Sequence, residues 1–306
     1  YQSCSGDSEA FLLGNQPTAG ELILDLISLE YSEVVMAAAG HQAEEAKHQA
    51  MEKYKGQYIL IVEGSIPTGA DGAYCTIAGE SAMVDCKKLV QNAAATICVG
   101  SCSSFGGIPA AAPNPTNAVS VSSLVPGAAI INLPGCPVNA TNLTATIVHF
   151  MTFGKLPAVD RLGRPKFAYG KRIHDNCERR GHFDAGQYAD SFVDESHRQV
   201  HCLYKLVCNG HDSFHNCPNV RYYEGTSWPV LAGHGCMGCS EPGFWDTMSP
   251  FYRRLPKVPG FGIEDTADKI GIGLAAATAV AFGIHGVASC FRKGDAMEED
   301  KVVKED

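Results

Sequence analysis

Residues 93–107 read AAATICVGSCSSFGG, a seven-residue apolar run that passes directly into a glycine-rich turn. Two further stretches repeat the pattern: QYILIVEG over residues 57–64 and AAIINLPGCP over residues 128–137. Short apolar runs rich in β-branched residues are typical of buried strands. Because helical patterns separate these runs, the sequence predicts an α/β fold with a parallel sheet and a site at the carboxyl ends of its strands.

The segments around these strands predict the domain organisation. Residues 21–50 carry apolar side chains at helical spacing and predict a helix before the first strand. Residues 171–239 hold six cysteines and seven histidines with little apolar periodicity. We therefore predict an α/β domain over residues 1–165, an irregular, mostly helical domain over 166–265, and an apolar helix with a charged tail over 266–306.

The composition excludes several classes of protein. The 306 residues are 45% hydrophobic and 19% charged, which excludes a disordered or fibrous chain. A formal net charge of -9 argues against a broad basic surface, so we expect no nucleic-acid partner. The cysteine count, 13, is odd, and no apolar leader is visible, which favours a reducing, cytoplasmic location over a secreted disulfide framework.

The cysteines fall into three groups that could hold metal. The first group comprises Cys217 and the CxxC pair Cys236 and Cys239; the second, His174, Cys177, Cys202 and Cys208; the third, Cys4, Cys102 and Cys136 in turns near strand ends. Soft thiolates suit zinc or iron–sulfur clusters. One structural zinc would suffice for a domain of this size, so three separate centres favour electron transfer.

Seven segments together resemble the small, electron-transferring subunit of the [NiFe]-hydrogenases. They are CSGDSE (4–9), YILIVEGSIP (58–67), VGSCSSFGGI (99–108), LPGCPVN (133–139), IHDNCERR (173–180), CLYKLVCNG (202–210) and AGHGCMGCSEP (232–242). The resemblance implies an N-terminal flavodoxin-like domain and a partner large subunit that carries the nickel–iron centre. It also implies that this chain has no catalytic residue of its own.

By this resemblance, the proximal [4Fe-4S] cluster would be held by Cys4, Asp7, Cys102 and Cys136. Asp7 stands where most members have a fourth cysteine, as in the actinobacterial-type, high-affinity, oxygen-insensitive uptake hydrogenases. A carboxylate is a harder ligand than a thiolate, so it is expected to alter the potential and redox stability of the cluster. The alternative is that Asp7 caps a helix or loop beside an incomplete cluster.

The resemblance also implies the other two clusters. The distal [4Fe-4S] cluster would use His174, Cys177, Cys202 and Cys208, and the medial [3Fe-4S] cluster would use Cys217, Cys236 and Cys239. Pro229, which cannot ligate, falls where some relatives have a fourth medial cysteine. Gly6 and Gly107 stand where oxygen-tolerant membrane-bound members carry two extra cysteines, so any oxygen tolerance here has another origin.

Several residues keep a simpler interpretation. We expect Cys75, Cys86, Cys98 and Cys290 to be small buried hydrophobes. Glu63 either tunes the surroundings of the proximal site or caps a strand. Residues 270–290 lack charged side chains but are rich in glycine and alanine. We expect them to form a helix packed on protein or lying at the cytoplasmic membrane face, rather than a membrane span.

These features together predict an electron-relay subunit of an uptake hydrogenase. Electrons from H2 oxidation would pass from the proximal to the medial and distal clusters, and then to an external redox protein or quinone-linked subunit. A higher oligomer of heterodimers is expected. One alternative is a relay subunit of a cofactor- or quinone-reducing complex, which usually lacks the second cluster region. Another is a zinc-stapled binding module, which would be colourless and free of iron.

Overall fold

Three parallel strands form the central sheet of the computed structural model, which describes residues 1–248 and 270–289. The strands are β1 (Ile59–Glu63), β5 (Ala95–Val99) and β7 (Ile130–Leu133), in the order β1-β5-β7. β5 lies between the other two, with Ile97 aligned to Ile61 and Ile131. The predicted parallel α/β sheet is therefore confirmed.

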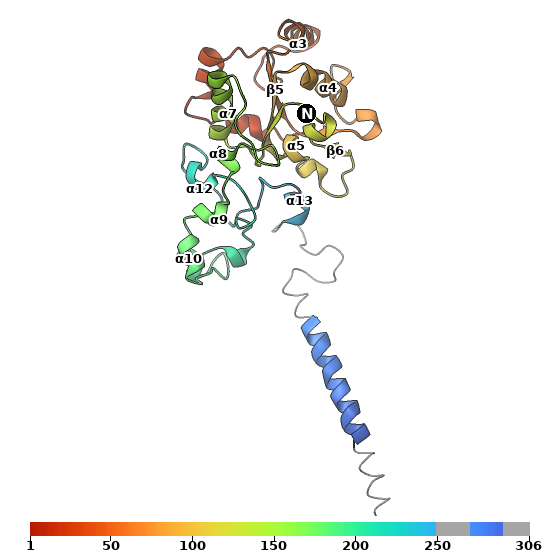
Figure 1. The fold of residues 1–306 in the computed structure, drawn as a ribbon, viewed down its shortest axis with the longest axis vertical. Coiled ribbons are helices and arrows are strands. Elements are labelled where there is room, and N and C mark those ends of the chain that lie inside the picture. The colour runs from red at the N-terminus through yellow and green to blue at the C-terminus, as the bar shows by residue number, and fades with distance from the viewer. Residues whose placement is uncertain (249–269, 290–306) are drawn as a thin grey trace, which may run out of the picture. The chain divides into compact units, whose positions relative to one another are not determined.

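Helices cover both faces of this sheet because side chains alternate between the faces of a strand. Ile97 and Val99 pack in one cluster with residues of α7 (Ala140–Phe153), whereas Cys98 packs in another with residues of α4 (Ala82–Asn92). Figure 1 shows α7 and α4 on opposite sides of β5. All five residues of β5 are buried, which explains why that segment is apolar throughout.

Apart from the helix His41–Lys53, which has 13 residues, the remaining elements are short. Those before β7 are α1 (Gly6–Leu12), α2 (Ala19–Glu21), η1 (Leu22–Leu26), α3 (His41–Lys53), β2 (Ile66–Pro67), η2 (Gly69–Gly72), β3 (Thr76–Ile77), β4 (Glu80–Ser81), α5 (Gly100–Phe105), η3 (Ile108–Ala110), β6 (Ala118–Val119) and α6 (Val121–Leu124). Those after α7 are α8 (Lys166–Tyr169), α9 (Ile173–Asn176), α10 (Arg180–Asp184), α11 (Glu195–Arg198), η4 (Tyr204–Leu206), α12 (Cys217–Val220) and α13 (Phe244–Thr247).

The single helix predicted over residues 21–50 is wrong. The chain forms α2 and the short π-helix η1, leaves the helical conformation at Ile27, and starts a new helix only at α3. Leu24 is 82% exposed, so the apolar side chains of this segment do not form one stripe packed on a core. Apolar spacing alone does not sustain a helix without such packing.

The region after α8 has a small core of its own. It consists of Ile173, Ala189, Leu203, Leu206, Cys217, Trp228, Val230 and Cys236. The core of the sheet extends to Tyr169, just past the predicted boundary at residue 165. That boundary stays a prediction, and the one at 265 lies outside the described residues, as do Cys290 and the charged tail.

The chain divides into two units, Tyr1–Tyr252 and Arg253–Asp306. In the second unit, Ile270–Ser289 forms a helix that is long and apolar enough to cross a membrane. Its most apolar stretch is fully exposed. The predicted helix over this segment is confirmed, and its packing on protein or at a membrane face stays a prediction.

Candidate iron–sulfur sites

The carboxyl ends of the strands bring the first group of predicted ligands together. β5 runs directly into α5, which carries Cys102, and β7 runs into the turn that carries Cys136. The two turns are joined by hydrogen bonds in which Ser101 N donates to Gly135 O (2.8 Å) and Gly135 N donates to Ser101 Oγ (3.0 Å). Parallel strands therefore fix Cys102 and Cys136 at one edge of the sheet.

Glu63, the last residue of β1, holds the N-terminal segment at the same edge. Its Oε1 accepts hydrogen bonds from Asp7 N (3.0 Å) and Ser3 Oγ (3.2 Å), and Ser8 also donates to the carboxylate. Ser5, which precedes α1, makes no side-chain cap. A carboxylate at a helix N-terminus satisfies unpaired N–H groups and complements the helix dipole. Glu63 thus caps α1 from another element rather than capping its own strand.

The Asp7 side chain joins α1 to the turn after Cys136. It is only 7% exposed, and its Oδ1 accepts a hydrogen bond from Val138 N at 2.6 Å. The carboxylate lies against Gly100, where φ is +76° and a Cβ would collide with it. Burial raises the pKa of Asp7 to about 7, against the opposing effect of the Val138 hydrogen bond. Among the described residues, Oδ2 has no hydrogen-bond partner.

The three cysteines and Asp7 lie close enough to influence one another. Burial is the main reason that the pKa of Cys102 rises to about 11 and that of Cys136 to about 12. The nearby charges of Asp7 and Cys4 raise both further. The structure therefore gathers all four predicted proximal residues; the Cys136 sulfur is surrounded by protein, although the residue, like Cys4, keeps exposed surface.

The second group of predicted ligands lines one cavity. His174, at α9, and Cys177, just after it, face Cys202 and Cys208 across this cavity. The ring of Phe183 packs edge-on against His174, with 4.4 Å between centroids. Burial, and then the charge of Arg180, lower the pKa of His174, which favours the neutral imidazole. A neutral imidazole and three thiols form a donor set that suits iron.

The third group is the most deeply buried. Cys217 begins α12, and Cys236 and Cys239 come from one loop. Burial raises the pKa of Cys217, and the charges of Cys239 and Cys236 raise it further, which shows that the three sulfurs lie near one another. His215 Nδ1 lies 2.9 Å from Cys217 Sγ. Burial and Arg164 lower the pKa of His215 to about 3.

The three groups lie beside one another in series. The backbone of Cys136 lies near the sulfur of Cys239 and opposes the effect of burial, which raises the pKa of that thiol, so the first group lies beside the third. The N–H of Cys236 donates to Cys208 Sγ at 3.3 Å, which joins the third group to the second. At Gly235 a Cβ would lie 2.9 Å from Cys208 Cα, so only glycine allows this close approach.

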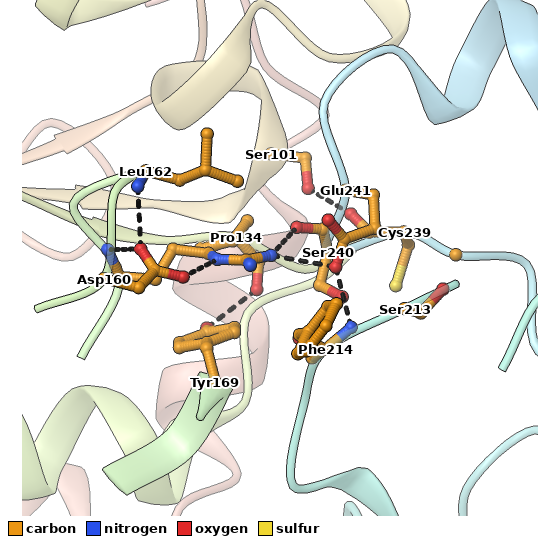
Figure 2. Close-up of polar contacts among 12 residues, drawn as sticks. Ser101, Pro134, Asp160, Leu162, Tyr169, Ser213, Phe214, Cys239, Ser240 and Glu241 are labelled. Carbon is orange, nitrogen blue, oxygen red and sulfur yellow. Dashed lines mark hydrogen bonds and ion pairs between the residues drawn. The ribbon is translucent and has the colours of Figure 1, made fainter. Parts of the chain in front are cut away.

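A buried arginine fixes the junction between the sheet edge and the Cys239 loop. Arg164, only 4% exposed, donates from Nε to Asp160 Oδ2 (2.8 Å) and from Nη1 to Glu241 Oε1 (2.8 Å) and Ser240 O (3.0 Å). Figure 2 shows the two carboxylates with the hydrogen bonds and ion pairs that hold them. Glu241 Oε1 also accepts from Phe214 N at 2.7 Å, so the same network fixes the segment before Cys217.

Sequence reasoning missed Arg164, Glu241 and His215. The contact between Arg164 and Glu241 spans 77 residues, and no local pattern marks it. His215 lies two residues before the predicted ligand Cys217, and this position could have marked it in the sequence as a residue near the metal site. Of the four cysteines outside the three groups, Cys86 and Cys98 are buried as expected, Cys75 is half-buried, and Cys290 lies outside the described residues.

The ligand groups are not arranged for a single metal ion. Within residues 1–248 and 270–289, no set of three His, Cys, Asp or Glu side chains converges on one such position. The ligands of a cluster bind different iron atoms and need not converge on one point. Donor sets rich in thiols suit iron–sulfur clusters as well as zinc.

Two protein families and several known proteins match this chain. Residues 169–252 match the C-terminal family of NiFe/NiFeSe hydrogenase small subunits, and residues 4–150 match the 20 kDa subunit family of NADH ubiquinone oxidoreductase. The quinone-reactive Ni/Fe-hydrogenase small chain of Wolinella succinogenes is 50% identical, covering 95% of this chain and 84% of the relative. The uptake hydrogenase small subunit of Azotobacter vinelandii is 47% identical, with 95% and 81% covered.

Solved structures share the fold. The [NiFeSe]-hydrogenase of Dm. baculatum superposes with a TM-score of 0.76 at 33% identity, covering 82% of this chain and 95% of that one. The actinobacterial-type NiFe-hydrogenase of Ralstonia eutropha H16 superposes with a TM-score of 0.73 at 24% identity, covering 91% and 88%.

The fold and these similarities define an electron-transferring iron–sulfur subunit. The chain belongs to the small-subunit family of the [NiFe]-hydrogenases. It is the electron-relay subunit of an oxidoreductase whose nickel–iron centre resides in a partner large subunit.

Proposed function

We propose that this chain relays electrons in an uptake hydrogenase, from H2 oxidation in the large subunit to an external acceptor. The observation that carries the proposal is the close succession of the three ligand groups. The backbone of Cys136 lies near the sulfur of Cys239, and Cys236 N donates to Cys208 Sγ. These contacts support the order proximal, medial and distal for the three groups. The chain's own contribution is to bury the clusters, fix their ligands and tune their potentials.

Each ligand group supports one cluster type. Four ligands at the proximal site, Cys4, Asp7, Cys102 and Cys136, suit a [4Fe-4S] cluster, as do His174, Cys177, Cys202 and Cys208 at the distal site. Three ligands at the medial site, Cys217, Cys236 and Cys239, suit a [3Fe-4S] cluster. At Gly107 a Cβ would lie 2.5 Å from Cys102 Sγ, so an additional cysteine there would not fit without movement.

Asp7 is proposed as the fourth proximal ligand. Its Oδ1 is taken by Val138 N, while Oδ2 has no hydrogen-bond partner among the described residues and is available to iron. The same carboxylate would thus make a structural hydrogen bond through Oδ1 and bind iron through Oδ2. On this basis we place the chain with the actinobacterial-type group in its proximal ligation, and propose that the carboxylate underlies oxygen tolerance.

Exposed parts of the chain support two proposed contacts, one with the large subunit and one with a membrane face. Cys4 and Cys136 are exposed in the isolated chain, so the proximal site opens where a large subunit would cover it. The uncovered apolar helix Ile270–Ser289 supports peripheral attachment at the cytoplasmic membrane face, where a quinone-linked or other redox subunit would accept electrons. Formation of a higher oligomer of heterodimers is part of the proposal.

A metal count and spectroscopy of the purified complex test the proposal. We expect a nickel-containing partner, about eleven iron atoms on this chain from two [4Fe-4S] and one [3Fe-4S] cluster, and an electron paramagnetic resonance (EPR) signal from the oxidised [3Fe-4S] cluster. Zinc without iron or a partner would show that the thiol groups are structural instead.

The alternative is a relay subunit of a cofactor- or quinone-reducing complex. The match of residues 4–150 to an NADH ubiquinone oxidoreductase subunit supports a shared N-terminal domain. The match of residues 169–252 to the hydrogenase C-terminal family favours the hydrogenase. Co-purification of nickel separates the two possibilities, because only the hydrogenase requires it.

A further inference from the structure

A buried imidazole lies beside the proposed medial site without being one of its ligands. His215 is 1% exposed, and its Nδ1 lies 2.9 Å from Cys217 Sγ. The ring packs edge-on against Tyr169, with centroids 4.8 Å apart and an interplanar angle of 89°. Within the described part of the chain, its other ring nitrogen, Nε2, has no hydrogen-bond partner. Among these residues, the only polar contact of the imidazole is therefore the Cys217 sulfur.

The direction of that contact follows from the chemistry of the sulfur. A thiolate that binds iron has no proton and can only accept a hydrogen bond. Nδ1 must therefore carry the proton of the imidazole and donate it towards Cys217. The unpartnered Nε2 is then the deprotonated nitrogen, which needs no acceptor.

The residues on both sides of His215 hold it in place. Phe214 N donates to Glu241 Oε1, which is fixed by the Arg164 ion pair. On the other side, the Asn216 side-chain amide exchanges hydrogen bonds of 2.9 Å with Asn142. The imidazole is therefore fixed towards the sulfur by contacts that do not involve the sulfur itself.

A second polar group reaches the same sulfur. The Tyr222 hydroxyl also faces Cys217. The hydroxyl proton has a second acceptor, however, which is Pro137 O at 3.1 Å. Among the described residues, Nδ1 of His215 has no acceptor other than the Cys217 sulfur, so His215 is the donor directed at Cys217 alone.

We propose that His215 raises the reduction potential of the medial cluster by donating its Nδ1–H to the Cys217 sulfur. This inference rests on the proposed function, because it requires Cys217 to be a cluster ligand. Reduction adds one electron, received from the proximal cluster and passed on to the distal one, while the imidazole keeps its proton. A hydrogen bond to a ligand sulfur stabilises the more negative, reduced form and so raises the potential.

Potentiometric titration of the complete hydrogenase complex, followed by the EPR signal of the oxidised [3Fe-4S] cluster, tests the proposal. His215→Phe keeps the ring but removes the donor, and we expect a lower midpoint potential. His215→Asn places an amide donor near the Nδ1 position, and we expect a potential close to the parent. His149→Phe makes the same change at a half-buried histidine of α7, outside the three ligand groups, and should leave the potential unchanged.

A second pair of variants covers the case in which His215→Phe does not assemble. His215→Gln places its amide near Nε2 rather than Nδ1, so its potential should fall while that of His215→Asn does not. Equal potentials in the parent, the Asn and the Gln variants would overturn the role of His215. If the parent itself gives no oxidised [3Fe-4S] signal, the medial ligand assignment fails first, and the inference about His215 fails with it.

Discussion

The sheet edge and the region from residue 169 to 248 position their ligands in different ways. At the sheet edge, Cys102 and Cys136 follow strands whose core contains no predicted ligand. In the later region, Cys217 and Cys236 are themselves members of the eight-residue core, and Cys177 and Cys208 pack against it. The first region thus folds around apolar side chains, and the second folds around its ligands.

The lengths of the helices agree with this contrast. α7 has 14 residues, whereas α8 to α13 have four or five each. Helices this short are not stable by themselves. The later region therefore depends on side-chain networks and on whatever its cysteines bind, since metal binding supplies folding free energy directly.

Removal of the clusters should have the largest effect and should separate the two regions. In complex treated with a chelator and an oxidant, we expect amide hydrogen exchange between residues 169 and 248 to accelerate by about 100-fold or more. The strands β1, β5 and β7 should keep most of their protection, because their core is independent of the ligands. Untreated complex, incubated for the same time, is the control. Equal loss of protection in both regions would contradict the comparison.

Breaking the ion pair of Arg164 should have the next largest effect, because it joins the two regions. Arg164→Met leaves the buried carboxylate of Glu241 and the half-buried carboxylate of Asp160 without their partner, and we expect a loss of about 3–5 kcal/mol in the free energy of unfolding. Arg164→Lys should lose less. The matched control is Arg198→Met, since Arg198 forms an exposed ion pair with Glu195 and should change stability by no more than about 0.5 kcal/mol.

Denaturant unfolding of the assembled complex measures both variants. If Arg164→Met were as stable as Arg198→Met, the junction between the sheet edge and the Cys239 loop would not depend on this guanidinium group.

The contrast between the regions also explains what the sequence could predict. The strands were recognisable because burial on both faces requires continuous apolar runs such as Ala95–Val99. The ligand groups were recognisable because thiols at fixed spacing have few functions other than to bind metals or clusters. The helix over residues 21–50 failed because spacing shows where a stripe of apolar residues lies, but not whether another element covers it. Leu24, which no part of the described chain buries, is the example.

No local sequence pattern marks the long-range polar contacts that hold the ligand-bearing segments. Arg164 meets Glu241, and Asp7 meets Val138, only after the fold has brought distant segments together. Such long-range polar contacts leave no periodic signature in the sequence. They determine how the ligands are oriented, so the ligand types were predictable while their supporting contacts were not.

Substitutions of Asp7 would separate its two roles at the sheet edge, which are to accept the hydrogen bond of Val138 N and to bind iron. Asp7→Asn keeps an oxygen that can accept from Val138 N but is neutral and a poor iron ligand. We expect stability close to the parent, together with loss of one iron from the proximal cluster and a new three-iron EPR signal. Asp7→Ala loses both roles and should cost a further 1–3 kcal/mol, roughly the cost of an unsatisfied buried N–H.

Asp7→Cys restores the thiolate found in most members of the family and should change both the proximal potential and the oxygen tolerance. A full iron complement and an unchanged potential in Asp7→Asn would show that Asp7 is only a structural contact.

The smallest effect is expected at the cap of α1. Glu63→Gln keeps an acceptor for Asp7 N but removes the negative charge at the helix N-terminus, which should cost about 0.5–1 kcal/mol. Glu80→Gln, in an exposed ion pair with Lys88, is the matched control and should cost less. Because strands rather than α1 fix Cys102 and Cys136, the proximal EPR signal should persist in both variants. If the proximal signal were lost in Glu63→Gln alone, the ligand geometry at the sheet edge would depend on this single carboxylate. The sheet edge would then resemble the region from residue 169 to 248, which depends on its own ligands.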